Sequence, residues 1–348
     1  MSTRWCKAAL FLFAIALIAC LWSPASWAQK GLVVEKYSKL LYLPVLVAGF
    51  QNLRTRQLSI HAFLLAIIIT CSLSILKFHG FLQTFTFDPD YIFRNHIVTG
   101  FMVAFSAYLT ILFSYRNKGG IRITYGLLAL LFSYQVLFVS GARTGYIIYL
   151  LLMMILVLQL CTWRQAVVGM VMVVALFAGS YLASPVMKMR VDAIGQQLTR
   201  YQHDDKDTDI GIRLQFHDFA HKLFNRHPLF GNGTGSFTYN FDVEKPVPAW
   251  DRKLLEPHSQ YWLIAAEFGV LGIIALLYFF LTLIQASLKL DKMKAIALAM
   301  LIPFMIGNVS DSLLLYSGPG YFFILFMGLC LGEGLEIQKK SSQYRRYL

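Results

Sequence analysis

Charged side chains are scarce in this chain of 348 residues. Only 14% of its residues are Asp, Glu, Lys or Arg, whereas 57% are hydrophobic. Soluble globular domains carry roughly 25% charged residues, so this composition excludes an ordinary soluble protein. Apolar runs of about 20 residues, the length that crosses the hydrocarbon core of a bilayer, recur along the chain. We therefore expect an all-α polytopic membrane protein with about ten transmembrane helices.

The first apolar run leaves two interpretations open. Arg4 and Lys7 precede a short apolar stretch, and Ser26-Trp27-Ala28 resembles a signal-peptidase site. The run is therefore either a membrane span or a cleaved signal peptide. The ten runs lie near residues 6–22, 31–50, 58–76, 96–115, 120–139, 144–161, 164–183, 258–288, 293–315 and 319–337.

Motifs for cofactors are also missing. All five cysteines lie in or beside apolar runs, which excludes a disulfide framework in the polar part of the chain. His217 and His221 have the spacing of a metal pair, but no Glu follows the first histidine as a zincin motif requires. Gly231, Gly233 and Gly235 lack the Lys-Ser/Thr of a phosphate-binding loop. We expect no metal, nucleotide or other cofactor.

One long polar segment interrupts the apolar runs. It divides the chain into a membrane block of about seven spans (1–183), a loop (184–258) and a closing block of about three spans (259–348). The loop carries ten Lys and Arg and ten Asp and Glu, so the net charge of +13 lies in the membrane blocks and their short connections. This distribution argues against a nucleic-acid partner, and loops of this kind often carry function.

Cations outside the loop indicate the orientation. With the N-terminus in the cytoplasm, 15 of these 21 Lys and Arg lie on the cytoplasmic side and six on the other. The positive-inside rule therefore predicts that both termini are cytoplasmic and that the large loop is outside. The basic C-terminal tail contributes Lys339, Lys340, Arg345 and Arg346 to the cytoplasmic side.

Within the loop, residues 211–224 predict an amphipathic helix. Ile212, Phe216, Phe219 and Leu223 form an apolar stripe, and Arg213, His217 and His221 form a polar stripe beside it. Such a helix can lie along the outer membrane–water boundary.

Four further residues could carry chemistry. Arg143 lies in a turn between two apolar runs, where a charge is costly and often binds a ligand or snorkels to lipid phosphates. His258 lies at the start of the next apolar run, and histidine suits proton transfer near neutral pH. Glu267 and Asp311 are carboxylates within apolar runs that could support a site or pair with a buried arginine.

Together these features resemble the O-antigen ligase and polymerase superfamily of bacterial envelope glycosyltransferases. Their order and spacing agree over about residues 120–335. The resemblance rests on Ser140-Gly141-Ala142-Arg143-Thr144-Gly145, on Arg213 at the start of a loop helix, on His227-Pro228-Leu229-Phe230-Gly231-Asn232-Gly233, and on His258-Ser259-Gln260-Tyr261-Trp262-Leu263 followed by Glu267-Phe268-Gly269-Val270-Leu271-Gly272.

The resemblance implies an inverting glycosyltransferase in the bacterial inner membrane, with its large loop in the periplasm. Its donor would be a glycan on undecaprenyl diphosphate, and in ligases the acceptor is a sugar hydroxyl of lipid A–core. Two arginines bind the diphosphate and a histidine activates the acceptor, without metal or nucleotide. Carried over, these roles fall on Arg143, Arg213 and His258. Asp311, Glu267, His217 and His221 are supporting candidates, membrane lipids are further partners, and the oligomeric state is not indicated.

Several alternatives stay open. One compact loop with Arg213 and His258 favours a ligase over an O-antigen polymerase, and a protein O-oligosaccharyltransferase fits equally where the acceptor is concerned. A lipid-linked glycan transporter is disfavoured, because transporters place charges near the membrane midplane and these gather outside. The chain also departs from the family: it is about two spans shorter at its N-terminus, and Ser259 stands where asparagine is common.

Overall fold

The computed structural model describes residues 4–83, 86 and 88–344, so the predicted tail residues Arg345 and Arg346 lie outside the described part. Every regular element among the described residues is a helix, and none is a strand. The chain forms two compact units, which are described separately below. Unit 1 comprises Met1–Arg56 and Gln196–Leu348, and unit 2 comprises Gln57–Gly195.

The prediction of an all-α polytopic membrane protein is confirmed. Within the described residues, eight helices are long and apolar enough to cross a membrane, and they match eight of the ten predicted runs. The other two runs take a different form. Residues 27–49 form three consecutive shorter helical segments, and the run near 293–315 contains the helix Lys294–Gly307, which is shorter than a full span.

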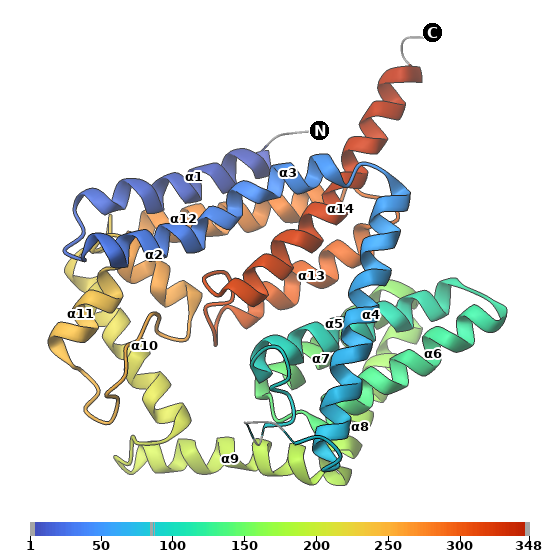
Figure 1. The fold of residues 1–348 in the computed structure, drawn as a ribbon, viewed down its shortest axis with the longest axis horizontal. Coiled ribbons are helices and arrows are strands. Elements are labelled where there is room, and N and C mark those ends of the chain that lie inside the picture. The colour runs from blue at the N-terminus through green and yellow to red at the C-terminus, as the bar shows by residue number, and fades with distance from the viewer. Residues whose placement is uncertain (1–3, 84–85, 87, 345–348) are drawn as a thin grey trace. The chain divides into compact units, whose positions relative to one another are not determined.

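In unit 1, the first and last parts of the chain pack together. Helix α1 lies along α12, and α3 and α13 lie along α14 (Figure 1). The unit contains α1 (Arg4–Ile18), η1 (Ala19–Leu21), α2 (Trp27–Ser38), η2 (Lys39–Leu41), α3 (Tyr42–Gly49), the start of α4 (Leu53–Phe78), the end of α9 (Pro185–Gln202), α10 (Asp209–Arg226), α11 (Ser236–Glu244), α12 (Gln260–Ser287), α13 (Lys294–Gly307) and α14 (Ser317–Tyr344).

The N-terminal segment is tied to the Gly-rich loop that follows α10. The Trp22 indole donates a hydrogen bond to the carbonyl of Gly231 over 3.3 Å, and the Ser23 hydroxyl donates to the carbonyl of Thr234 over 2.7 Å. The Thr234 hydroxyl in turn donates to the carbonyl of Ala16. The first apolar run is therefore an integral part of unit 1 in this structure.

Helix α12 is broken at Gly269, whose φ of 64° and ψ of −159° are not helical. The Gly-rich loop supplies the backbone partners that the break removes. The amides of Asn232 and Gly233 donate to the carbonyls of Ala266 and Glu267, and the amides of Val270 and Leu271 donate to the carbonyls of Pro228 and Leu229. A broken helix at membrane depth is tolerated when other protein groups satisfy its backbone. Here the loop does so.

The loop glycines are required by close contact with neighbouring backbone. Gly231 has a φ of 69°, and a Cβ there would lie 2.3 Å from the Glu267 backbone. Gly233 has a φ of 92°, and a Cβ there would lie 2.6 Å from Ser23. Only glycine accepts these conformations without strain and leaves room for the approach.

Helix α10 confirms the predicted amphipathic helix. Thr208 caps its start, its hydroxyl accepting from the amide of Gly211 at 3.1 Å. Phe216, Phe219 and Leu223 are buried, and the two phenylalanines pack edge-on against Phe241 of α11. The apolar stripe thus faces protein rather than the membrane boundary.

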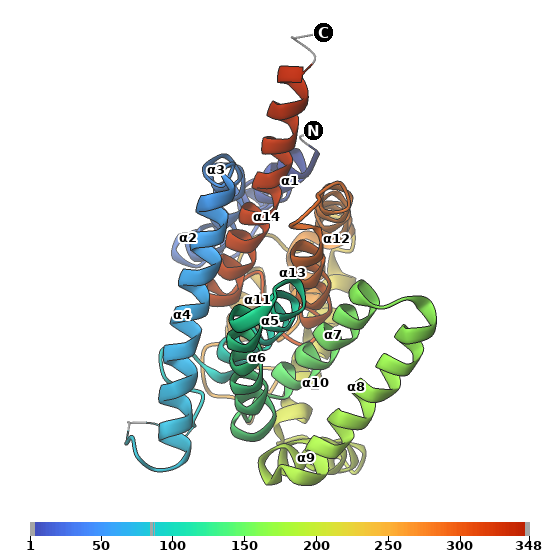
Figure 2. The ribbon, with the colours of Figure 1, turned by 90° about the vertical axis from the view of Figure 1, so that its right-hand side faces the viewer.

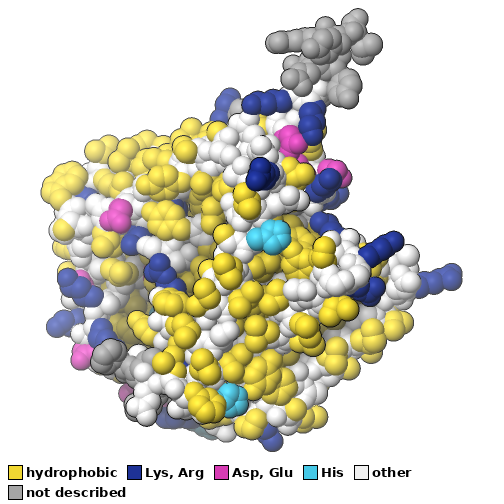
Figure 3. Space-filling model, turned by 45° about the vertical axis from the view of Figure 1, so that its right-hand side comes forward, with side chains coloured by type: hydrophobic (Ala, Val, Ile, Leu, Met, Phe, Trp, Pro, Cys, Tyr) yellow, Lys and Arg dark blue, Asp and Glu magenta, His cyan; other side chains and the backbone are white. Residues whose placement is uncertain are grey.

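Unit 2 is a bundle in which α5 packs against both α6 and α7, and α7 against α8 (Figure 2). Helices α4, α6 and α8 expose many large apolar side chains, as expected of surfaces that face lipid, and hydrophobic side chains cover much of the face drawn in Figure 3. The unit contains the rest of α4, α5 (His96–Arg116), α6 (Gly119–Tyr134), the π-helical turn η3 (Gln135–Val139), α7 (Arg143–Leu160), α8 (Trp163–Ala183) and the start of α9.

Candidate active site

His258 lies just before α12, which Ser259 caps. Its backbone has a φ of 55°, in the left-handed region that residues other than glycine rarely adopt. The His258 amide donates to Oε2 of Glu256 over 2.6 Å, which holds this conformation. Strained backbone of this kind gathers at functional positions.

Two carboxylates flank the same ring nitrogen of His258. Its Nδ1 lies 3.2 Å from Oε1 of Glu256 and 3.4 Å from Oδ1 of Asp311. Carboxylates accept hydrogen bonds, so the neutral ring carries its proton on Nδ1, and Nε2 is the nitrogen with the lone pair. The ring of Phe216 stacks on the imidazole, with centroids 5.9 Å apart, and the His258 side chain is 19% exposed. This geometry orients a general base.

Glu256 is buried and is held by donors from a distant part of the chain. Oε2 accepts from the Ser312 hydroxyl over 2.6 Å, in addition to the His258 amide. Oε1 accepts from the Tyr316 hydroxyl over 2.6 Å. Burial and the neighbouring Glu256 carboxylate raise the pKa of Tyr316 well above its ordinary value, so this hydroxyl stays protonated and donates.

The segment that carries Asp311, Ser312 and Tyr316 is itself fixed by buried side chains. The ammonium of Lys39 donates to the carbonyls of Leu314, Leu315 and Tyr316 over 2.8, 2.9 and 3.0 Å. The Lys39 side chain is fully buried, and these three carbonyls satisfy its N–H donors. The carbonyl oxygen of the Gln260 side chain also accepts from the amide of Leu315, over 3.0 Å.

Helix α10 brings its polar stripe to this cluster. His217 Nε2 donates to the carbonyl of His258 over 3.3 Å, and burial lowers the pKa of His217, which favours its neutral form. Arg213 is half-buried, and its positive charge acts on both His217 and Tyr316. His221, one turn further along, contacts the ring of Trp262 instead of His258.

Glu267 does not join the cluster. It is buried in α12 at the level of the break, where its carboxylate faces the backbone amides of Gly235 and Phe237 at the start of α11. The N-terminus of a helix favours a negative group. Among the described residues, however, both side-chain oxygens of Glu267 are buried without a hydrogen-bond partner.

In unit 2, Arg143 is the first residue of α7, and a buried carboxylate shapes the turn before it. The Asp90 carboxylate accepts from the side-chain amide of Gln135 over 2.7 Å, from the Ser140 hydroxyl over 2.6 Å and from the backbone amide of Gly141 over 3.1 Å. The Ser140 carbonyl also accepts from the hydroxyl of Tyr146. Burial raises the pKa of Asp90 to about 6.

Two glycines of the same turn allow close packing. A Cβ on Gly141 would lie 3.1 Å from the Nε of Arg190, whose guanidinium passes over this backbone. A Cβ on Gly145 would lie 3.3 Å from the Cα of Gly100 on α5. Close contacts with other residues of unit 2 therefore fix the backbone that presents Arg143.

Of the residues singled out in the sequence, the structure brings His258, Asp311, His217 and Arg213 into one part of unit 1. Glu267 and His221 lie outside this cluster. Arg143 belongs to unit 2, where it begins α7. Glu256, Ser312 and Tyr316 were not predicted. Only Glu256 carried a sequence signal, a carboxylate two residues before the candidate histidine.

Residues 127–277 match the family model described as O-antigen ligase. This match supports an O-antigen ligase-like superfamily assignment. The matched segment contains Arg143, Arg213, Glu256 and His258, whereas Asp311 lies beyond it. A comparison with curated proteins found no match.

The match implies, in general terms, a glycosyltransferase-like enzyme of the O-antigen ligase and polymerase type. Its substrates are, in general terms, a lipid-linked glycan and an acceptor. The apolar helices show a multi-pass membrane protein, which suits substrates that are themselves anchored in lipid.

Proposed function

We propose that this O-antigen ligase-like protein is an inverting glycosyltransferase that moves a glycan from undecaprenyl diphosphate to a sugar hydroxyl of lipid A–core. The observation that supports it best is the orientation of His258. With Nδ1 directed at Glu256 and Asp311, Nε2 is the nitrogen that can take a proton from an acceptor hydroxyl. The same relation of histidine to carboxylate orients the general base of serine hydrolases.

The proposed reaction is a single displacement. His258 Nε2 removes the proton of the acceptor hydroxyl as the oxygen attacks the anomeric carbon of the donor. The bond from that carbon to the diphosphate oxygen breaks, and undecaprenyl diphosphate leaves with the electron pair. Attack from the face opposite the leaving group inverts the anomeric centre. Glu256 and Asp311 stabilise the imidazolium that forms.

Arg143 and Arg213 are the proposed ligands of the diphosphate. A guanidinium presents planar donors that match two phosphate oxygens at once. Arg143 is the first residue of α7, where the helix dipole adds positive potential, whereas Arg213 lies one turn inside α10. Stabilisation of charge on the leaving group is the role that a metal ion plays in other transferases.

The proposed location of the reaction is the periplasmic face of the inner membrane. The support is the predicted excess of Lys and Arg on the side of both termini, which by the positive-inside rule favours an outside position for the segment 184–258. Donor and acceptor are then both presented at the outer leaflet.

Transfer by the purified protein tests the proposal. The donor would be offered with three acceptors in separate reactions: lipid A–core, a second lipid-linked glycan, and pilin. Transfer to lipid A–core supports a ligase. Transfer to the lipid-linked glycan alone would identify a polymerase, and transfer to pilin alone a protein O-oligosaccharyltransferase.

The same reaction with a chelator tests the expectation that no metal takes part. Among the residues that the structure describes, no group of three or more His, Cys, Asp or Glu has the geometry of a metal site. Undiminished transfer in chelator is the expected result. Loss of transfer that added divalent cation restores would contradict the metal-free mechanism.

A further inference from the structure

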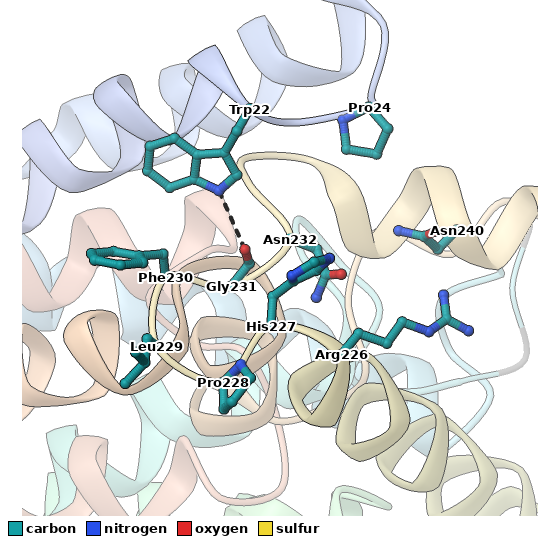
Figure 4. Close-up of a pocket in the computed structure, with 10 residues that line it drawn as sticks. All are labelled: Trp22, Pro24, Arg226, His227, Pro228, Leu229, Phe230, Gly231, Asn232 and Asn240. Carbon is teal, nitrogen blue, oxygen red and sulfur yellow. Dashed lines mark hydrogen bonds between the residues drawn. The ribbon is translucent and has the colours of Figure 1, made fainter.

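A cavity in unit 1 has no role in the proposed reaction. It has a volume of about 940 Å³, within the range of small-ligand pockets, and lies where the segment after α1 meets the loop after α10 (Figure 4). Apolar walls come from Trp22, Leu229 and Phe230, and polar side chains come from Arg226, His227, Asn232 and Asn240, with Pro24, Pro228 and Gly231 completing the lining.

The apolar side offers a fixed aromatic surface. Trp22 is 43% exposed, and its Nε1 is held by the Gly231 carbonyl, so the indole has a defined orientation. The loop opposite is locked to the break in α12 by the backbone bonds of Pro228 and Leu229. An exposed aromatic ring attracts the C–H groups of a ligand through its electron-rich face.

The polar side offers hydrogen-bond acceptors. The amide nitrogen of Asn232 donates to the carbonyls of Leu223 and Ala266, and the amide nitrogen of Asn240 donates to the carbonyl of Ser236. The side-chain oxygen of Asn240, which is half-buried, is therefore left as an acceptor for a ligand, whereas Asn232 is only 8% exposed. Acceptor oxygens suit hydroxyl groups and disfavour phosphate or carboxylate.

Arg226, the arginine that lines the cavity, forms an ion pair with Glu244. Its two terminal nitrogens donate to the two carboxylate oxygens of Glu244, over 2.6 and 2.8 Å. Because this pair occupies the planar fork that would otherwise bind a phosphate, Arg226 does not make the cavity an anion site. A neutral sugar ring fits this lining, because its C–H groups can pack on the aromatic wall and its hydroxyl groups can donate to the acceptor oxygens.

Helix α10 joins this cavity to the candidate active site. His217 contacts His258 and Arg226 lines the cavity, nine residues further along the same helix. At 1.5 Å per residue, the separation along the helix is about 14 Å. A glycan whose reacting end lies at His258 can cover this distance with a few sugar rings.

We propose that the cavity lined by Trp22 and Asn240 is a subsite for neutral sugar rings of a glycan substrate, remote from the bond that is made or broken. The proposal rests on the proposed function, and both substrates carry such rings. Binding at this subsite adds affinity without entering the chemical step, so its loss raises KM and leaves kcat unchanged.

Steady-state kinetics tests the subsite and identifies which substrate uses it. Trp22→Ala and Asn240→Ala are each expected to raise KM about tenfold, which corresponds to about 1.4 kcal/mol, the size of one aromatic contact for Trp22 and of one hydrogen bond for Asn240. A higher KM for the acceptor assigns the subsite to the acceptor glycan, and a higher KM for the donor assigns it to the donor glycan. Trp22→Phe, which keeps an aromatic face, should recover most of the affinity. Trp27→Ala is the matched control, because Trp27 is 79% exposed and does not line the cavity.

Direct binding separates this proposal from the proposed function. The probes are the oligosaccharides released from lipid A–core and from the donor, freed of lipid and phosphate, and titrated against the full-length protein while Trp fluorescence is recorded. Saturable binding that Trp22→Ala abolishes supports the subsite even where no transfer is detected. Transfer that depends on His258, together with unchanged KM values in both variants and no oligosaccharide binding, would overturn the subsite alone. Saturable binding of a fatty acid, with no binding of either oligosaccharide, would also overturn the subsite.

Discussion

Nδ1 of His258 lies 3.2 Å from Oε1 of Glu256, a residue whose carboxylate also accepts the backbone amide of the same histidine. Glu256 thus fixes both the left-handed backbone of His258 and the tautomer of its ring. Asp311 approaches the same nitrogen at 3.4 Å. The two carboxylates are therefore unequal partners, and this inequality can be measured.

Glu256→Gln should reduce kcat more than Asp311→Asn does. Glu256 accepts bonds from Ser312, Tyr316 and the His258 amide, and an amide nitrogen at this position would face donors. We expect a loss of about 10²–10⁴-fold for Glu256→Gln, the range of a general-base contribution. Single-turnover transfer at saturating donor measures it. An equal or larger loss in Asp311→Asn would reverse the proposed ranking.

Lys39→Met should lower both stability and kcat, although Lys39 is not part of the proposed chemistry. Its removal leaves the carbonyls of Leu314, Leu315 and Tyr316 without their shared donor, at a cost of about 1–3 kcal/mol for each buried group that water cannot reach. Thermal unfolding in detergent and transfer kinetics measure the two effects. Lys36→Met is the control, because Lys36 bonds only the Ser317 hydroxyl, over 3.1 Å. Equal effects of the two substitutions would contradict the role of Lys39.

Gly231→Ala should prevent correct folding of unit 1. Its Cβ would collide with the Glu267 backbone at 2.3 Å and would occupy a left-handed φ of 69°. Overpacking and strain of this kind cost several kcal/mol, about as much as the whole stability of many domains. Gly179→Ala is the control, since a Cβ there meets nothing within 4 Å. The yield of monodisperse protein is the readout, and a normal yield of Gly231→Ala would show that the loop does not dock as described.

The stability contributed by Asp90 should fall as pH rises. Burial raises the pKa of this carboxyl from 3.8 to about 6, so the folded state holds the proton more tightly than the unfolded state. The contribution is full below pH 3.8, declines towards pH 6 and is lost above it. The total is on the order of 3 kcal/mol, since each pKa unit is worth about 1.4 kcal/mol.

Asp90→Asn isolates this effect, because asparagine does not titrate. The difference in unfolding free energy, wild type minus variant, should decrease between pH 4 and pH 7. A difference that is constant over this range, or one that increases with pH, would contradict the assignment. Asp90→Asn should also weaken donor binding, since Asp90 holds Ser140 and Gly141 of the turn before Arg143.

Local patterns in the sequence predicted most of the long apolar helices and four candidate residues that lie together in unit 1, namely His258, Asp311, His217 and Arg213. The apolar stripe of Phe216, Phe219 and Leu223 predicted α10, and the order of Arg143, Arg213 and His258 indicated the superfamily. Hydrophobic periodicity reports the face that a helix buries. It does not report the partner, and the stripe packs against α11 instead of lipid.

The residues that sequence reasoning missed act through contacts between distant segments. Glu256 acquires its role from Ser312 and Tyr316, more than fifty residues further along, and Lys39 acts on the same segment from near the N-terminus. The requirement for glycine at 231 likewise depends on the break at Gly269. Contacts between such distant segments cannot be predicted from composition and spacing.

The central claim is that His258 takes the proton of the acceptor. The most direct measurement compares single-turnover transfer and equilibrium donor binding in His258→Gln with the same quantities in His221→Gln, whose exposed histidine contacts Trp262 outside the cluster. The account predicts that His258→Gln loses about 10²–10⁴-fold in the rate of transfer while its affinity for the donor is unchanged, and that His221→Gln retains both. Transfer by His258→Gln at the wild-type rate would contradict it.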